Sequence, residues 1–468
     1  MVTKEYKIFI NGKWSFGTNS GKMIDRINPA TGKIVSRYIE ASDIDVNKAV
    51  DIGSRTLNLG SWSELSREKK SLILIKAADQ IEENLNELAS IEALETGKLI
   101  EDAENDIKNS IKLWRYAASA VRTIYGEYIN SLNRKNSAYT LYCPIGVVAL
   151  ILPWNFPFIV LSERLPFILA AGCSVVTKPS EYASGTSLRL CNLLKNAGLP
   201  NGVYNVVTGY GNKIGKTLAE HKDISMISFT GSTENGKSVM ASASKNLAKV
   251  SLELGGKSPV IVFSDADLEQ AAEGVLSGFT DNAGQCCIAT SRLIVQKSIA
   301  SYFKKLIALK IQKIKFKQPL ATKDQFDKVK SYIEKARDLL GDKMIGGEID
   351  EKKQYISPAI IELPDTNHNL YKNEIFGPIL VMTRFSNEKN ALEIANDTNY
   401  GLAASIWTNN LVLANRIVTK INAGRLWINS KQVNFPELPI GGMKLSGIGR
   451  EAGLQGILSY SEIKSVIF

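Results

Sequence analysis

Val147-Val148-Ala149-Leu150-Ile151-Leu152 is an unbroken apolar run, and it indicates the fold class. A run of this length without alternation is typical of a strand that is buried on both faces in a parallel sheet. Comparable apolar segments follow at residues 174–177, 203–208 and 226–230, each separated from the next by a helical pattern. Strands that recur every ~25–30 residues with helices between them predict a doubly wound α/β sheet.

Other parts of the sequence also show regular patterns. A second strand–helix alternation begins near residues 260–262 and extends to about residue 429, which predicts a second α/β unit. Residues 125–142 and 459–468 alternate polar and apolar side chains, as exposed strands do. At ~100–200 residues per domain, a chain of 468 residues is long enough for two or three domains.

The composition is that of an ordinary globular protein, with 44% hydrophobic and 22% charged residues. The formal net charge is +10, but the lysines are spread along the chain, so we expect no nucleic-acid binding. The apolar runs are too short to cross a bilayer and the first residues form no signal region, so we expect no membrane association. Two histidines without a motif predict no metal site, and five cysteines with one adjacent pair fit a reducing compartment, the cytoplasm.

Three turns carry groups that are suited to covalent chemistry at a carbonyl carbon. Cys286 and Cys287 follow a small-residue turn. Glu253 precedes two glycines, and Asn155 lies in a turn flanked by prolines. Such a reaction needs a thiolate that attacks, an N–H donor that holds the oxyanion and a base that activates water. A buried thiol, a solvated carboxylate and a turn-forming asparagine are the structural alternatives, and the residues alone do not distinguish Cys286 from Cys287.

Two further turns stand at the carboxyl ends of expected strands, where doubly wound sheets bind their ligands. Gly231 and Ser232 open a helix whose free amides can hold a phosphate, although the G-x-G-x-x-G fingerprint is absent. Lys178 and Glu181 can hydrogen-bond a ribose. A plain helix cap and a surface turn are the alternatives, so these motifs point to a dinucleotide only in combination with the others.

In combination, the motifs resemble those of the aldehyde dehydrogenase superfamily over nearly the whole chain. The tail from Pro436-Glu437-Leu438-Pro439 onward is similar to its betaine- and aminoaldehyde branch, and the segment near residues 315–320 is shorter than usual in the family. The matching strings are Pro153-Trp154-Asn155-Phe156-Pro157, Lys178-Pro179-Ser180-Glu181, Phe229-Thr230-Gly231-Ser232, Glu253-Leu254-Gly255-Gly256-Lys257, Gly284-Gln285-Cys286-Cys287, Glu374-Ile375-Phe376-Gly377-Pro378, and Gly441-Gly442 with Ser446-Gly447.

The resemblance implies a role for each group. It selects Cys287 as the nucleophile, Glu253 as the general base and Asn155 as the amide that binds the oxyanion. The implied activity is NAD(P)-dependent oxidation of an aldehyde to a carboxylic acid through a thiohemiacetal and a thioester. Glu374 would hold the nicotinamide ribose, with Phe376 beside the ring. The residues implied to bind the dinucleotide are Trp154, Lys178, Glu181, Gly231, Ser232, Gly255, Gln325, Lys328, Glu374 and Phe376.

The family fold that this resemblance implies has two doubly wound α/β domains and a small β flap for oligomerisation. We expect the dinucleotide-binding domain at residues 1–118 and 142–252, the catalytic domain at 253–443, and the flap at 119–141 and 455–468. Because an exposed strand edge pairs readily with another chain, we predict a homodimer or homotetramer.

Three positions bear on cofactor and substrate choice. Glu181 accepts hydrogen bonds from a free ribose 2′-hydroxyl and repels a 2′-phosphate, so we predict NAD as the preferred cofactor and NADP as the alternative. Relatives that oxidise succinate semialdehyde usually carry tunnel arginines at the positions of Glu163 and Asp281. Two carboxylates there disfavour an anionic substrate and favour a cationic aminoaldehyde or a neutral hydroxyaldehyde. Phe156 and Trp427 are candidates for an incomplete aromatic box around a cation.

Several alternatives stay open at this point. Glu163 pairs with Arg164 in one of them and never contacts the substrate. A CoA-acylating relative would transfer the acyl group to coenzyme A, but such enzymes commonly lack the base at Glu253. A catalytically silent binding or structural protein on this fold would lack the nucleophile, base or amide, and all three are present. Nucleic-acid binding driven by net charge would give a salt-dependent gel shift.

Overall fold

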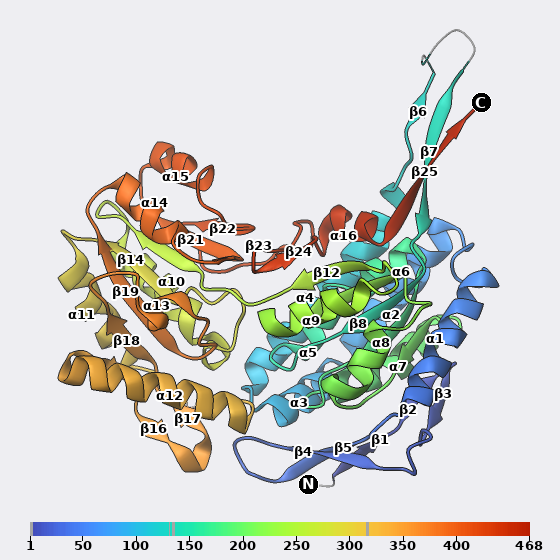
Figure 1. Cartoon of the computed structure of the whole chain (residues 1–468), viewed down its shortest axis with the longest axis horizontal. Coiled ribbons are helices and arrows are strands. Elements are labelled where there is room, and N and C mark those ends of the chain that lie inside the picture. Colours follow the sequence, from blue (N-terminus) through green and yellow to red (C-terminus); the bar gives the residue numbers. More distant parts are fainter. Residues whose placement is uncertain (1–2, 131, 133–135, 315–317) are drawn as a thin grey trace.

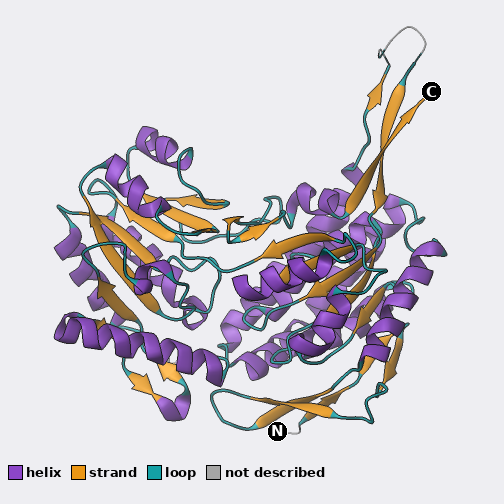
Figure 2. Cartoon of the chain, viewed as in Figure 1, coloured by secondary structure: helices purple, strands orange, loops and turns teal. Residues whose placement is uncertain are grey.

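The α/β alternation folds into two lobes and a projecting arm (Figure 1). Figure 2 shows helices flanking the strands of both lobes, whereas the arm consists of strands. Residues 131 and 133–135 of the expected flap, and residues 315–317 of the shortened segment, lie outside the described residues. The computed structural model describes residues 3–130, 132, 136–314 and 318–468.

The apolar run at residues 147–152 forms β8 (Val147–Ile151), in the middle of the first sheet. In the described part of the chain this sheet has eight strands, in the order β24-β12-β11-β8-β9-β10-β2-β3. β8 pairs in parallel with β9 (Ser174–Lys178) and β11 (Met226–Thr230), and all residues of β8 and β9 are buried. The remaining strands are β2 (Ile8–Ile10), β3 (Lys13–Ser15), β10 (Tyr204–Val206), β12 (Lys249–Glu253) and β24 (Gly447–Ile448).

Helices cover both faces of this sheet, because successive residues of β8 face opposite sides. Val148 and Leu150 join the core formed with α2, α4 and α7, whereas Val147 and Ala149 join the core formed with α1 and α8. The prediction of a doubly wound sheet is therefore confirmed. The helices of this lobe are α1 (Asp43–Asn58), α2 (Arg67–Glu83), α3 (Leu85–Thr96), α4 (Ile100–Ala120), α5 (Pro157–Ser162), α6 (Leu165–Ala171), α7 (Gly185–Ala197), α8 (Lys216–Ala219), α9 (Thr233–Ala243) and α16 (Gly453–Ser459).

The second alternation forms a seven-stranded sheet among the described residues, in the order β15-β18-β19-β14-β13-β21-β22. All of these strands except β15 run parallel to their neighbours. α10 and α11 pack on one face and α14 and α15 on the other. The elements are β13 (Pro259–Val262), α10 (Leu268–Thr280), β14 (Arg292–Gln296), α11 (Ala300–Ile311), α12 (Lys323–Leu340), β15 (Ile345–Gly346), β18 (Ala359–Glu362), α13 (Asn369–Lys372), β19 (Ile379–Phe385), α14 (Glu388–Asn396), β21 (Ala403–Trp407), α15 (Leu411–Val418) and β22 (Arg425–Ile428).

The arm is an antiparallel sheet of β6 (Tyr128–Ile129), β7 (Ala138–Pro144) and β25 (Ser461–Ile467), so segments far apart in sequence lie side by side (Figure 1). β7 extends past residue 141, the end expected for the flap. No helix in the described ranges is both long and apolar enough to cross a membrane. The peripheral strands are β1 (Lys4–Tyr6), β4 (Met23–Ile27), β5 (Ile34–Ile39), β16 (Ile349–Asp350), β17 (Tyr355–Ile356), β20 (Tyr400–Gly401) and β23 (Met443–Lys444).

Candidate active site

The turn that precedes Cys286 and Cys287 has an unusual backbone. Asn282, Ala283 and Gly284 follow α10 with φ values of 52°, 54° and 71°. Left-handed conformations are uncommon for residues other than glycine, so two of these three positions are strained. At Gly284 a Cβ would lie 2.3 Å from a backbone carbon of Gly377, so no larger residue fits. The turn delivers both thiols to the amino end of β14.

Asn155 is tied to this turn by hydrogen bonds in both directions. Its Nδ2 donates to the backbone oxygen of Gln285 at 2.9 Å, and Asn282 Nδ2 donates to the backbone oxygen of Asn155 at 2.9 Å. Gln285 Nε2 closes the turn through a bond to Asn282 O at 2.9 Å. Asn155 is only 6% exposed. The structure therefore brings Asn155 and the cysteine turn together, and it gives Asn282 and Gln285 of this turn a positioning role that the sequence did not reveal.

Glu253 ends β12 and is buried. Within the described residues, its Oε1 atom has no hydrogen-bond partner. Burial raises the pKa of this carboxyl well above its ordinary value, and the charges of Glu451 and Cys287 act in the same direction, while Arg164 opposes them. A carboxylate that is desolvated, unpartnered and electrostatically linked to a thiol is suited to take a proton.

The two thiols interact with each other. The pKa of Cys287 is well above its ordinary value, first because of a side-chain hydrogen bond with Cys286 and then because of burial. The charges of Glu163 and Glu374 raise it further. Both cysteines keep partial solvent exposure. These interactions favour the protonated thiol of Cys287, and the nucleophilic thiolate forms as the pH rises.

Glu163 pairs with its neighbour, as one of the open alternatives stated. Arg164 Nη1 lies 3.1 Å from Glu163 Oε2. Arg164 is 2% exposed, and despite burial its pKa is raised by Glu451, Glu163 and Glu253. Its buried charge is thus balanced by several carboxylates. The ion pair is the one that this alternative expected, and Glu163 stays close enough to raise the pKa of Cys287.

The two candidate box aromatics already have partners inside the protein. The ring of Phe156 lies 4.2 Å from Lys98 Nζ, a fully buried ammonium that also pairs with Glu92. Trp427 is 7% exposed, and its indole N–H donates to the backbone oxygen of Val433 at 2.9 Å. A protein cation therefore already contacts the ring of Phe156, so the aromatic box is weaker support for a cationic substrate than the residue types suggested.

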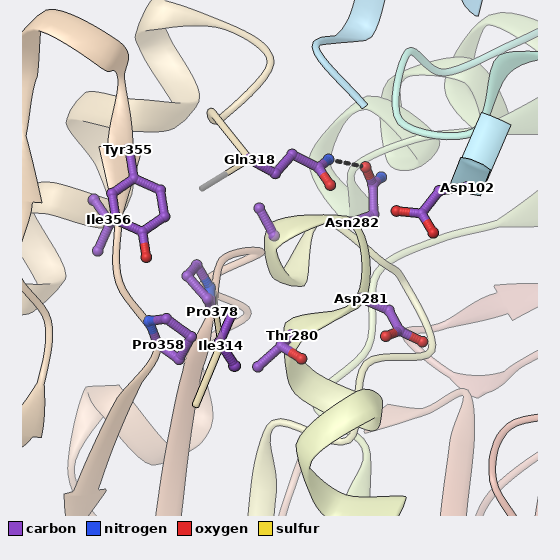
Figure 3. Close-up of a pocket in the computed structure, with 11 residues that line it drawn as sticks. Asp102, Thr280, Asp281, Asn282, Ile314, Gln318, Tyr355, Ile356, Pro358 and Pro378 are labelled. Atoms are coloured by element: carbon purple, nitrogen blue, oxygen red, sulfur yellow. Dashed lines mark hydrogen bonds between the residues drawn. The ribbon is translucent and has the colours of Figure 1, made fainter. Parts of the chain in front are cut away.

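Asp281 lines a cavity of about 100 Å³ behind the cysteine turn (Figure 3). Asp102, from α4, lies at the same end of this cavity, and Gln318 donates a hydrogen bond to Asn282 there at 2.6 Å. Although the residue as a whole is exposed, partial burial of its carboxyl group and the charge of Asp102 raise the pKa of Asp281 to about 6. Asp281 thus interacts with a second carboxylate, which raises its pKa, and with the ammonium of Lys431, which lowers it.

The residues expected at the adenosine end of a dinucleotide lie at the ends of β9 and β11, the two strands that flank β8. Lys178 Nζ, at the end of β9, donates to Glu181 Oε2 at 2.9 Å. Gly231 follows β11, and Ser232 caps α9 by accepting a hydrogen bond from the Asn235 amide. Among the described residues the buried Oγ1 of Thr230, also at this strand end, has no partner. An unpartnered hydroxyl beside a helix N-terminus fits a phosphate.

The residues expected at the nicotinamide end form a second cluster. Glu374 Oε1 accepts a hydrogen bond from the Gly256 amide at 3.0 Å. At Gly255 a Cβ would lie 2.1 Å from Glu374 Oε2, so only glycine leaves room for this carboxylate. Gln325 Nε2 donates to the backbone oxygen of Phe376 at 2.7 Å, which holds Phe376 at a positive φ of 62°. The glycine pair and Gln325 therefore position Glu374 and Phe376.

Three more side chains complete this cluster. Trp154 contacts Phe376 edge to face, with ring centroids 5.7 Å apart. Burial raises the pKa of Glu374, and the charge of Lys328 acts to lower it. Lys257 was not singled out from the sequence, although it closes the Glu253–Lys257 string. It is buried, burial lowers its pKa to about 7, and its Nζ has no hydrogen-bond partner within the described residues. Each expected catalytic and cofactor residue thus lies in one of these clusters, whereas Asp281 lines the cavity in Figure 3 and Phe156 and Trp427 have the partners described above.

Comparison with known proteins agrees with this geometry. The model of the aldehyde dehydrogenase family matches residues 16–466. The aminoaldehyde dehydrogenase 1 of Pisum sativum is 37% identical, with 98% of this chain and 95% of the relative covered. An NAD-dependent aldehyde dehydrogenase from Sinorhizobium meliloti superposes with a TM-score of 0.97 at 40% identity, covering 100% and 95% of the two chains. A betaine aldehyde dehydrogenase from Staphylococcus aureus, solved with NAD+, gives a TM-score of 0.95 at 32% identity, covering 98% and 94%. The chain belongs to the aldehyde dehydrogenase family, whose members are oxidoreductases.

Proposed function

We propose that Cys287, Asn155 and Glu253 catalyse the oxidation of an aldehyde to a carboxylic acid, with NAD+ as the oxidant. The observation that carries this proposal is the reciprocal hydrogen bonding between Asn155 and the turn that bears Cys287. The thiolate of Cys287 attacks the carbonyl carbon, and the resulting oxyanion accepts hydrogen bonds from the Asn155 side chain and the Cys287 amide. Since only one of the two Nδ2 hydrogens of Asn155 is used by Gln285, the other is available.

Glu253 is assigned as the general base for the second half of the reaction. Its unpartnered oxygen and raised pKa suit a group that removes a proton from water. The activated water attacks the thioester carbon, Cys287 leaves as a thiolate, and the carboxylic acid is released. Because CoA-acylating enzymes commonly lack this base, its presence argues against such an activity. A catalytically silent binding protein is disfavoured because the nucleophile, the amide and the base are all present.

The two clusters at the strand ends suit a dinucleotide between them. Lys178 and Glu181 would hold the adenine ribose, Gly231 and Ser232 the pyrophosphate, and Glu374 the nicotinamide ribose. A bound nicotinamide would supply the acceptor for the hydride that leaves the tetrahedral adduct. Because Glu181 is fixed by Lys178 at the ribose position, a 2′-phosphate would meet its carboxylate, so we infer a preference for NAD over NADP.

For the substrate we propose a cationic or hydroxylated aldehyde instead of succinate semialdehyde. The support now comes mainly from Asp281 and its neighbour Asp102, because Arg164 balances the charge of Glu163. Two adjacent carboxylates would repel an anionic substrate. The name of the Pisum sativum relative, an aminoaldehyde dehydrogenase, points in the same direction.

Assembly and compartment complete the proposal. The arm carries exposed apolar side chains, Leu141 on its central strand and Ile463 and Ile467 on its edge strand β25, so we propose a homodimer or homotetramer. Five free thiols favour a reducing compartment, the cytoplasm. We assign residues 1–118 and 142–252 to the dinucleotide-binding domain, and residues 253–443 to the catalytic domain.

Initial rates of NADH and NADPH formation over a panel of aldehydes test this function. The panel contains an aminoaldehyde, betaine aldehyde, a hydroxyaldehyde, a neutral aliphatic aldehyde and succinate semialdehyde. We expect NADH formation with cationic or hydroxylated aldehydes, its loss in Cys287→Ala, and its retention in the matched variant Cys143→Ala. A preference for succinate semialdehyde would refute the substrate class alone, whereas inactivity with every aldehyde and both cofactors would refute the reaction.

A further inference from the structure

A groove of about 830 Å³ lies at the carboxyl ends of strands of the second sheet, and the cysteine turn lies at the opposite ends of these strands. Cys287 precedes β14 and Glu374 precedes β19, so the candidate active site is at the amino ends of these parallel strands. The groove is lined from the other ends, by Lys297 after β14, by Arg384 near the end of β19 and by residues 362–366 at the end of β18. It is therefore separate from the site described above.

The topology of the sheet makes this position significant. β14 and β19 are neighbouring parallel strands. The helix that follows β14 is α11, which packs on the face formed by Leu293 and Val295. The helix that follows β19 is α14, which packs on the other face, against Ile294. The carboxyl ends of neighbouring strands whose helices diverge to opposite faces form a crevice, and open α/β sheets bind ligands in such crevices.

The groove carries an excess of positive charge. Lys304 Nζ lies 2.9 Å from Glu362 Oε2, and Arg384 Nε lies 2.7 Å from Glu362 Oε1, so one carboxylate orients two cations. The other cationic lining residues are Lys297 and Lys343, which are exposed and have no ion pair with any described residue. The lining residues thus include four cationic side chains but only two carboxylates, those of Glu362 and Asp365.

The donors that remain free match a phosphate group. The contact with Glu362 uses only Nε of Arg384, and no hydrogen bond or ion pair from the described chain reaches its two Nη atoms. A planar guanidinium with free Nη groups and flexible lysines around it is the usual combination for phosphate binding. The volume falls within the ~300–1,000 Å³ range of small-molecule sites.

We propose that this groove is a second ligand site, which binds a small phosphate ester or phosphoanhydride. Arg384 binds the phosphate through its free Nη atoms, Lys297 and Lys343 neutralise the remaining charge, and Glu362 keeps Arg384 and Lys304 in place. The site lies across the sheet from Cys287, so its occupant does not compete with the aldehyde or the dinucleotide.

Titration calorimetry on the whole enzyme tests this proposal, with saturating NAD+ present so that the dinucleotide site is blocked. The probes are inorganic pyrophosphate, adenosine monophosphate and adenosine. We expect both phosphate compounds to bind, adenosine not to bind, and hydrogen exchange to slow in peptides covering the end of β14 with α11 and the end of β18. Absence of phosphate binding, equal binding of adenosine, or protection elsewhere would overturn the proposal.

Charge-matched variants separate a site from general attraction. Lys297→Gln with Lys343→Gln removes two groove cations, whereas Lys305→Gln with Lys335→Gln removes two exposed lysines of α11 and α12 that do not line the groove. We expect the first pair to weaken pyrophosphate binding at least tenfold and the second pair to leave it within twofold. An equal loss in both would show nonspecific electrostatic binding and refute the site. Turnover of aldehyde is expected to be unchanged in both.

Discussion

The behaviour of Cys287 depends on the residue immediately before it. The interaction with Cys286 is the largest cause of the raised pKa of Cys287, so Cys286→Ala is expected to lower that pKa. A thiol reacts as the thiolate, which is present above its pKa and lost as the pH falls through it. The pH dependence of iodoacetamide alkylation should therefore shift to lower pH in Cys286→Ala. Cys143→Ala, which removes a partly exposed thiol on β7, should not shift it. An unshifted profile in Cys286→Ala would refute the coupling.

Glu253 should act only after the thioester has formed. Glu253→Gln keeps the size of the side chain and removes the base, so steady-state turnover should fall by ~10²–10⁴-fold, the usual contribution of a general base. Stopped-flow measurement should still show a burst of NADH, because the first half of the reaction does not need this base. In the wild type, the raised pKa of Glu253 means that hydrolysis slows as the pH falls. Loss of the NADH burst in Glu253→Gln would contradict this assignment, and so would an equal fall in steady-state turnover in the surface variant Glu334→Gln.

At the scale of elements, the sequence predicted the strands and their ends better than the turns between them. The apolar run of β8 and the polar residues that close β9 and β12 are local signals, because burial and strand ends depend on adjacent residues. The left-handed conformations of Asn282 and Ala283 have no such signal, since neither residue type requires them. Glu163 was a foreseeable partner of Arg164, but Glu253 and Glu451 could not be predicted, because they approach Arg164 only after the lobe has folded.

The turn after β12 gives a prediction at this scale. In Gly255→Ala the new Cβ would lie 2.1 Å from Glu374 Oε2, so the carboxylate must move. Overpacking of this kind costs ~1–3 kcal/mol, and we expect the KM for NAD+ to rise by about tenfold or more while the KM for the aldehyde changes less. Gly215→Ala is the control, because no atom lies within 4 Å of a Cβ at that position. An unchanged KM for NAD+ would show that Glu374 does not hold the cofactor.

At the scale of the whole molecule, pairings between distant segments decide the architecture. The family resemblance implied that the C-terminal strand joins the flap, and the structure adds the register, in which β25 pairs with β7 along its whole length, from Ser461↔Pro144 to Ile467↔Ala138. Likewise, Gly447 and Ile448 return to the first sheet as β24, beside β12. Such pairings join residues hundreds of positions apart, and one sequence holds no local signal for them.

The arm gives the last prediction. Ile463 is 58% exposed on β25, in a strand that presents its outer edge to solvent. If this edge is the surface that joins two copies, a buried carboxylate there would be unpaired and costly, so Ile463→Glu should lower the mass measured by light scattering to that of a smaller assembly. Lys464→Glu introduces the same group on the opposite face of the strand and should perturb assembly less. A wild-type monomer would refute the assembly, and an unchanged mass in Ile463→Glu with retained folding by circular dichroism would place the interface elsewhere.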